Sequence, residues 1–245
     1  MPGLETALVR KLDAFVELTG AEKVCLAELQ SPPFAVKRGK ELLQEGHAGN
    51  RVVILRTGWA SSYKDLPDGA RQIINFPVPG DCVGLRSVLL RTSDHSFAAL
   101  TDAQVSFVEA TRMLELLDDS PRLRAAFLWS AARDEAMTVE HLVSIGRRNA
   151  LERTAYFFME LAERLKLVGL AEETEFHCPL NQYVLADALG LSAIHVNRVL
   201  RLLRELNLLT LKAGKVFLLD IDGLRKLAGY RPMSVSRNRT LANSR

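Results

Sequence analysis

The sequence has few cysteines and no long hydrophobic run, and both absences narrow its class. Its three cysteines, Cys25, Cys82 and Cys178, are odd in number and far apart, so they predict reduced thiols rather than a disulfide framework or a metal knuckle. No stretch of about 18 apolar residues occurs, and residues 1–15 lack the apolar core of a secretion signal. The sequence therefore predicts a cytoplasmic protein without a membrane partner.

Common catalytic motifs are also missing. The sequence contains no phosphate-cradling Walker loop, no HExxH zinc pair and no GxSxG nucleophile turn. Its adjacent acidic pairs, Asp118-Asp119 and Glu172-Glu173, are interpreted as solvated surface. We therefore expect no catalytic residue and no metal site, and no cofactor is evident.

Charge is distributed unevenly along the 245 residues. The overall composition, 48% hydrophobic and 25% charged, is ordinary for a folded soluble protein and compatible with two domains. Residues 181–245 contain 11 Lys and Arg against 4 Asp and Glu, a net charge of +7, whereas residues 1–180 carry −4. The basic carboxy-terminal part favours a polyanionic partner, with a chance imbalance of surface charge as the alternative.

The apolar periodicity predicts an α+β fold. Short amphipathic helices are expected over residues 4–17 and 21–30, followed from Val36 to Val108 by short β-type runs such as RVVIL, which are typical of a β-roll or jelly roll. A long helix is expected from Pro121 to about Ile145, and a second one over residues 148–168. The predicted organisation is a β-roll part (1–120), a long helix (121–146), a carboxy-terminal part of helices and short strands (147–235) and a flexible basic tail (236–245).

Small and apolar residues form one stripe along the predicted long helix. They recur every three or four residues, which places them on one face and allows a second helix to approach closely. The stripe consists of Ala125, Leu128, Ala132, Ala136, Val139 and Val143. We interpret it as the seam of a homodimer, with packing against the chain's own domain as the alternative.

The most informative segment is NQYVLADALGLSAIHVNRVLRLLR, residues 181–204. Ala186, Gly190 and Val196 occupy the positions where a helix-turn-helix needs a small residue, a turn glycine and a core residue. Asn181 and Ser192 are each suited to cap the helix that follows. The segment therefore predicts two short helices, the second of which enters the major groove of DNA. After Asn207, the run LLTLKAGKVFLLD predicts a two-stranded wing that turns at Ala213-Gly214.

Polar residues gather on the outer face of the predicted second helix. Arg198 can donate two hydrogen bonds to a guanine, and Asn197 or His195 can bond a base edge or a phosphate. A solvated basic face on a packing helix is the alternative. Phosphate contacts are expected from Asn181, Tyr183, Ser192, Arg201, Arg204 and Lys215.

Several segments match one known family over nearly the whole chain. They are KRGKELLQEG, DGARQIINF and PGDCVGL, the turn glycines Gly58, Gly80 and Gly84, then GRRNALERTAYFFMELAERL and the helix-turn-helix segment. On these residues the chain resembles the Crp/Fnr family of bacterial regulators. The resemblance implies a cyclic-nucleotide-binding-type β-roll, a dimerisation helix and a winged helix-turn-helix. It also implies a homodimer that binds a palindromic double-stranded DNA site and recruits or obstructs RNA polymerase.

The effector residues of the family are not retained. In nucleotide-responsive members a glutamate after the glycine that matches Gly84 binds the ribose, and an Arg-Ser pair holds the cyclic phosphate. Here these positions carry Leu85 and the pair His95-Ser96, so cyclic AMP is not expected to bind. The resemblance implies a candidate effector pocket, for an unknown effector, at Leu85, Arg86, Ser87, His95 and Ser96.

Two further departures concern the sensed signal and the DNA sequence that is read. Oxygen-sensing members hold an iron–sulfur cluster on several cysteines near the amino terminus, where this chain has only Cys25, so no cluster is expected; haem is not excluded by motif. The glutamate usually found four residues before the base-reading arginine is replaced by Ile194. Isoleucine cannot accept a hydrogen bond from cytosine but can contact a thymine methyl group, so an altered half-site is expected.

Cys178 lies between His177 and the helix expected to start near Asn181. A helix dipole or a protonated histidine would lower its pKa, and its oxidation would then disturb DNA binding, with an inert thiol as the alternative. The alternative function is a small-molecule-binding sensor module in which DNA contact is incidental. That function predicts ligand binding without a sequence-selective DNA shift, whereas the +7 segment favours DNA.

Overall fold

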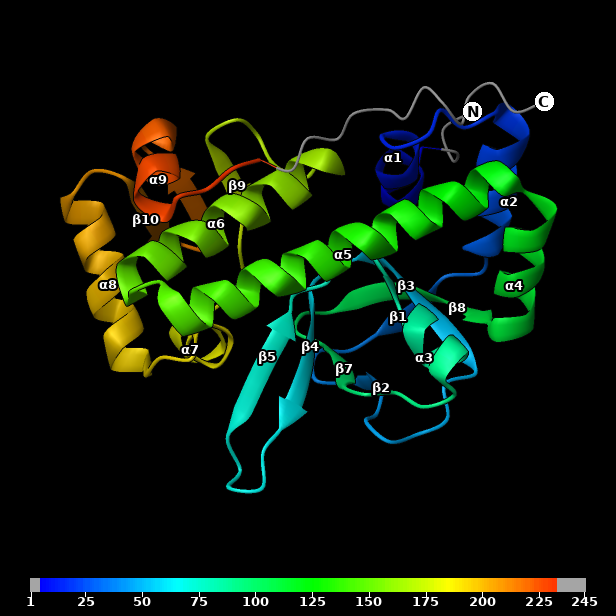
Figure 1. Cartoon of the computed structure of the whole chain (residues 1–245), viewed down its shortest axis with the longest axis horizontal. Coiled ribbons are helices and arrows are strands. Elements are labelled where there is room, and N and C mark those ends of the chain that lie inside the picture. The colour runs from blue at the N-terminus through cyan, green and yellow to red at the C-terminus, as the bar shows by residue number, and fades with distance from the viewer. Residues whose placement is uncertain (1–4, 233–245) are drawn as a thin grey trace. The chain divides into compact units, whose positions relative to one another are not determined.

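The computed structural model describes residues 5–232, which divide into two compact units (Figure 1). The first unit contains residues 5–64 and 75–134, and the second contains residues 65–74 and 135–232. The predicted basic tail, residues 236–245, lies outside the described residues. No helix in the described part of the chain is both long and apolar enough to cross a membrane.

The predicted β-roll consists of two four-stranded sheets and lies mainly in the first unit, with residues 71–74 of one strand assigned to the second. One sheet has the strand order β1-β8-β3-β6 and the other has the order β2-β7-β4-β5. The strands are β1 (Phe34–Val36), β2 (Glu41–Leu43), β3 (Arg51–Thr57), β4 (Ala60–Asp65), β5 (Arg71–Asn75), β6 (Cys82–Val83), β7 (Ser96–Ala99) and β8 (Ala103–Glu109).

The interior of the roll is apolar. The run from Val52 to Leu55 in β3 is fully buried. Because both faces of this part of the strand are covered, its residues are all apolar, whereas a strand with one face in water would alternate apolar and polar residues. Phe97 of β7 and Val105 of β8 are buried in the same core as Leu55. Each such side chain contributes roughly 1.5–3 kcal/mol by leaving water.

Four helices flank the roll, and the sequence indicated only the first two of them. They are α1 (Ala7–Asp13), α2 (Gly20–Leu29), α3 (Leu85–Leu90) and α4 (Ala110–Asp119). Within the first unit, the buried Lys11 Nζ of α1 lies 2.7 Å from Asp81 Oδ1, and the ring of Phe15 stacks on Trp129 at 4.1 Å. These contacts tie the amino-terminal segment to the roll and to the long helix.

That long helix, α5 (Pro121–Arg147), begins at the predicted proline. Proline suits a first helical turn because its missing N–H has no partner there in any case. The helix was expected to end at about Ile145, but it continues through Gly146 to Arg147. The boundary between the two compact units falls within α5, between Asp134 and Glu135.

Within the described residues, four helices and three strands follow α5 in the second unit, and one of these strands, β9, was not predicted. The elements are α6 (Ala150–Leu167), β9 (Glu175–His177), α7 (Gln182–Leu189), α8 (Ala193–Glu205), β10 (Leu209–Lys212), β11 (Lys215–Leu218) and α9 (Ile221–Ala228). Ala213 and Gly214 both have positive φ angles, 51° and 72°, which suit a two-residue hairpin turn. The unpredicted β9 pairs with β11, so the wing has three strands in the order β10-β11-β9.

Candidate nucleic-acid interface

The helix-turn-helix is formed by α7, the turn at Gly190 and α8. Asn181 Oδ1 accepts hydrogen bonds from the N–H groups of Tyr183 and Val184 at 2.9 and 3.1 Å, and Ser192 Oγ accepts one from His195 N at 3.2 Å. Both predicted caps are therefore confirmed, and each is worth about 1 kcal/mol. Gly190 has a φ of 62°, the left-handed conformation that ends α7 and that glycine adopts without strain.

The recognition helix α8 has one buried face and one exposed face. Val196, Val199 and Leu203 are buried, as the helical spacing predicted. They fix the rotation of α8 about its own axis, because turning the helix would bring these side chains into water. The opposite face is thereby held outward, away from the core of the unit.

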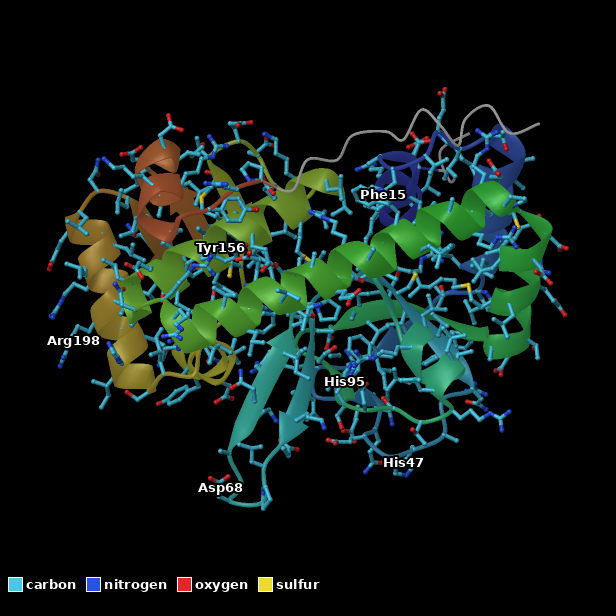
Figure 2. The ribbon with its side chains drawn as sticks, in the orientation of Figure 1. Phe15, His47, Asp68, His95, Tyr156 and Arg198 are labelled. Carbon is cyan, nitrogen blue, oxygen red and sulfur yellow. The ribbon has the colours of Figure 1, made fainter. Side chains whose placement is uncertain are left out.

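The exposed face contains all four predicted base-reading residues. Ile194, His195, Asn197 and Arg198 are exposed, and Figure 2 shows Arg198 on the outer side of α8, directed away from its own unit. Ile194 is 77% exposed, so its apolar side chain is available for contact. The face offers a guanidinium fork, an amide, an imidazole and an apolar contact, which are the groups that distinguish base pairs in a major groove.

The predicted phosphate-binding residues differ in which hydrogen-bond donors are available to a phosphate. Arg201 lies 3.8 Å from Glu205, an exposed pair that holds the guanidinium weakly. Tyr183 is exposed at the start of α7. Asn181 and Ser192 use a side-chain oxygen for capping, so only their amide and hydroxyl hydrogens remain for a phosphate.

The wing places two lysines across from each other. Lys212 and Lys215 are register partners in β10 and β11, and Lys215 Nζ is drawn to Glu175 Oε1 of β9 at 2.8 Å. Like charges directly opposite each other on a hairpin destabilise it. An anion at the wing tip, such as a phosphate, would relieve that repulsion.

The predicted dimer seam lies on the side of α5 that the chain's own residues leave exposed. Leu128 is 65% exposed and Val139 54%, while Ala126 and Met137 on the opposite side are buried. Of the remaining predicted members, Ala132 and Val143 are exposed and Ala125 and Ala136 are half-buried. Leu142, which the prediction omitted, is 72% exposed and extends the same stripe, since it follows Val139 by three residues.

The predicted effector positions are occupied by the chain's own contacts. The Arg86 guanidinium forms an ion pair with Asp94, and His95 Nδ1 lies 2.8 Å from Asp94 Oδ1. Burial acts to raise the pKa of Asp94, but His95 and Arg86 outweigh burial, so this pKa is below its ordinary value. An anionic ligand at Arg86 and His95 would therefore meet an ionised carboxylate.

Ser96 and Ser87, two further effector positions, also make contacts within the chain. Ser96 Oγ accepts a hydrogen bond from Glu45 N at 3.1 Å, and buried Ser87 packs directly against Gly49, where any Cβ would overlap it. Leu85 offers a ribose no acceptor. These residues do not fit a cyclic nucleotide. A cavity of about 330 Å³ does exist in the roll, but its lining, which includes Leu43, His47 and Phe107, contains none of the five predicted effector residues.

Of the two alternatives for Cys178, its burial favours the inert thiol. The residue is only 1% exposed, and burial raises the pKa of its thiol to about 12, despite a backbone hydrogen bond at Leu180 that acts in the other direction. Burial likewise raises the pKa of Cys82 to about 12. All three cysteines are free thiols. Within residues 5–232, no three His, Cys, Asp or Glu side chains come together as metal ligands.

Two protein-family models match the chain. The model described as a cyclic nucleotide-binding domain matches residues 33–120, and the model described as a Crp-like helix-turn-helix domain matches residues 152–227. The first match covers all eight strands of the β-roll, and the second runs from the first turn of α6 to the end of α9, leaving out the first two residues of α6 and the last residue of α9. The two matches leave the long helix α5 between them.

Curated relatives and a solved structure are also regulators of this type or their structures. The chain is 31% identical over 194 residues to the nitrogen fixation regulation protein FixK of Rhizobium meliloti, a match that covers 78% of this chain and 84% of that protein. It is 25% identical to the transcriptional activator protein anr of Pseudomonas aeruginosa over 87% of each chain. The structure of FixK2 from Bradyrhizobium japonicum matches with a TM-score of 0.72 at 27% identity, covering 82% of this chain and 98% of that one.

Proposed function

Because this chain belongs to the Crp/Fnr family of DNA-binding transcription regulators, we propose that it acts as a homodimer on a palindromic promoter site. The observation that carries the proposal is the exposed face of α8 at Ile194, His195, Asn197 and Arg198, held outward by a buried opposite face. Two such helices, one from each protomer, enter successive major grooves whose centres lie about 34 Å apart.

Each residue of this face has a distinct role in the proposal. Arg198 donates two hydrogen bonds to O6 and N7 of a guanine, and Ile194 contacts a thymine methyl group. Asn197 and His195 bond base edges or phosphates beside them. Phosphate contacts from Arg201, Tyr183 and Lys215, with the amide hydrogens of Asn181 and the hydroxyl of Ser192, set the register and the salt dependence of binding.

The exposed stripe of α5 supports the homodimer. Leu128, Val139 and Leu142 are large apolar side chains on one helix face, and a second copy of the helix would cover them. In a two-fold symmetric pair each residue is buried twice, once on each protomer. The proposed seam would therefore use the same residues of α5 on both protomers.

The regulator acts on transcription in the cytoplasm, by recruiting or obstructing RNA polymerase, and has no catalytic role. Its β-roll belongs to the cyclic-nucleotide-binding type, yet the Asp94 carboxylate between Arg86 and His95 opposes a nucleotide phosphate. A signal at the β-roll would therefore be something other than cyclic AMP. Such a signal would act by changing the balance between two poses of the DNA-binding parts.

Selection of bound DNA from a random pool tests the proposal with the full-length protein. The wild-type protein is expected to enrich a palindrome with one guanine contact per half-site. Arg198→Ala should weaken specific binding by about 1–3 kcal/mol and relax one position of each half-site. Arg201→Ala is the matched control, since removing a phosphate contact should weaken binding to all sequences alike. No enriched sequence, or an unchanged preference in Arg198→Ala, would refute the assignment.

A further inference from the structure

One arginine side chain joins the ends of two helices in the second unit. Arg153, in the first turn of α6, donates hydrogen bonds from Nε to Ser144 O at 3.0 Å and from Nη2 to Ile145 O and Arg148 O at 3.0 and 3.2 Å. Its Nη1 donates to Leu189 O at 2.5 Å. The first three carbonyls belong to the end of α5 and the link that follows it, and the fourth belongs to the last residue of α7.

The chemistry of these partners explains why an arginine occupies this position. Carbonyl groups in the last turn of a helix have no intrahelical donor, and they form the negative end of the helix dipole. A guanidinium group is planar, cationic and carries five N–H donors in fixed directions, so it can satisfy several carbonyls at set angles. Burial lowers the pKa of Arg153, but an arginine remains protonated in proteins.

The contact with α7 is made at the turn of the helix-turn-helix. Leu189 is followed by Gly190, and a Cβ built on Gly190 would lie 3.6 Å from Arg153 Nη1. Only Leu191 and Ser192 then separate Gly190 from the start of α8 at Ala193. A side chain that holds Leu189 therefore holds the base of the recognition helix relative to the end of α5.

We propose that Arg153 is a positioning residue that fixes the angle between the carboxy-terminal end of α5 and the helix-turn-helix, and thereby sets the half-site spacing that the dimer accepts. This inference rests on the proposed function, because a spacing exists only for a dimer on two half-sites. One added base pair moves a half-site by about 3.4 Å along the DNA and turns it by roughly 35°. A rigid joint rejects that change, whereas a loose joint follows it.

The test measures dissociation constants of full-length proteins on the selected palindrome with its spacer shortened by one base pair, unchanged, or lengthened by one or two. Wild-type protein is expected to lose roughly tenfold or more in affinity for each base pair of change. In Arg153→Gln this penalty should fall below about threefold, because the amide cannot reach both helix ends. Arg153→Lys, which keeps the charge but not the planar fork, should lie between them.

Arg147→Gln is the matched control, because Arg147 is an exposed arginine in the same last turn of α5. It should keep the wild-type spacer profile even if its overall affinity falls. An unchanged profile in Arg153→Gln, or an equal loss on every spacer, would overturn the proposal and leave Arg153 with a role in stability only. If Arg153→Gln does not fold in thermal unfolding measurements, Arg153→Lys decides by the same profile. A wild-type protein without any preferred spacing contradicts the homodimer proposal instead, which separates the two failures.

Discussion

At the scale of residues, Ile194 and Arg198 are the two side chains of α8 whose proposed base contacts can be separated. They are four positions apart, so they lie one above the other on the exposed face of the helix. Arg198 contributes donors for a guanine, whereas Ile194 contributes only an apolar surface. Because the two side chains are neighbours, they are expected to contact adjacent base pairs, and a change at one position should leave the other contact in place.

Replacing Ile194 should therefore change one letter of the half-site. Ile194→Glu supplies an acceptor for the N4 amino group of cytosine and removes the apolar contact with a thymine methyl group. Selection from random DNA is expected to shift that position from thymine to cytosine by about 1–3 kcal/mol, with the guanine contacted by Arg198 retained. Ile194→Ala is the control, and it should relax the position without a new preference. Retention of the original base by Ile194→Glu would show that Ile194 does not face it.

Single residues also show which parts of the site could be predicted from the sequence. The caps at Asn181 and Ser192 were predictable because a cap and its N–H partners lie within three residues of each other. The reactivity of Cys178 was not, since its pKa depends on burial by distant elements. Arg153 was missed for a similar reason: its partners are backbone carbonyls, and its Leu189 partner lies 36 positions away.

At the scale of elements, α5 combines two unlike faces in one helix. Met137 and Ser144 are buried on one side, and Leu128, Val139 and Leu142 are exposed on the other. The spacing of small residues predicted which side would be exposed. It did not predict Leu142, because the predicted stripe continued from Val139 to Val143, four residues later. Leu142, three residues after Val139, lies at the edge of the same helix face.

Charge placed on the exposed face should disrupt the dimer. Leu142→Glu is expected to raise the dimer dissociation constant at least about 100-fold, because each protomer loses a buried leucine and gains a buried charge at the seam. Analytical ultracentrifugation measures this directly, and DNA binding should weaken in parallel. Leu114→Glu, at an exposed leucine of α4, is the control and should remain as associated as the wild type. A dimer that tolerates Leu142→Glu would place the seam elsewhere.

Strand β9 illustrates why short elements are harder to predict than long ones. It contains three residues, and its Phe176 pairs with Val216, which is 40 positions further along the chain. Three residues cannot show a period, and the pairing that makes them a strand is not local. The two strands β10 and β11, joined by Ala213-Gly214, were predictable because the turn and both strands are contiguous.

At the scale of the whole molecule, His141 links three elements and makes stability depend on pH. From α5, its Nε2 bonds to Glu160 of α6, and its Nδ1 lies 3.3 Å from Ile74 O of β5. Arg164 Nη1 lies 3.4 Å from the other oxygen of Glu160. Burial acts to lower the pKa of His141, but the hydrogen bond and charge of Glu160 outweigh burial and Arg164, so this pKa is raised above 6.5.

The sign of the pH effect follows from that raised pKa. The stabilisation from protonated His141 is complete below the unfolded pKa of about 6.5 and is lost as pH rises through the higher folded pKa. Wild-type protein should therefore be more stable than His141→Gln near pH 6, by about 1–3 kcal/mol, and should lose this advantage in alkaline buffer. Thermal unfolding across this pH range measures the difference. An advantage that does not change with pH would show that His141 is neutral in the fold.

The Asp94 carboxylate competes with any free anion for Arg86 and His95, and its effective concentration decides how strongly. Arg86 and His95 contact a carboxylate that is part of the same chain, so it cannot be diluted. A tethered group over so short a distance competes at an effective concentration on the order of millimolar. A free anion present at micromolar levels would need an affinity for these two side chains about a thousandfold higher than that of the carboxylate to displace it. We therefore expect the roll to respond weakly at this position to scarce phosphate messengers, however closely its fold follows that of proteins that bind them.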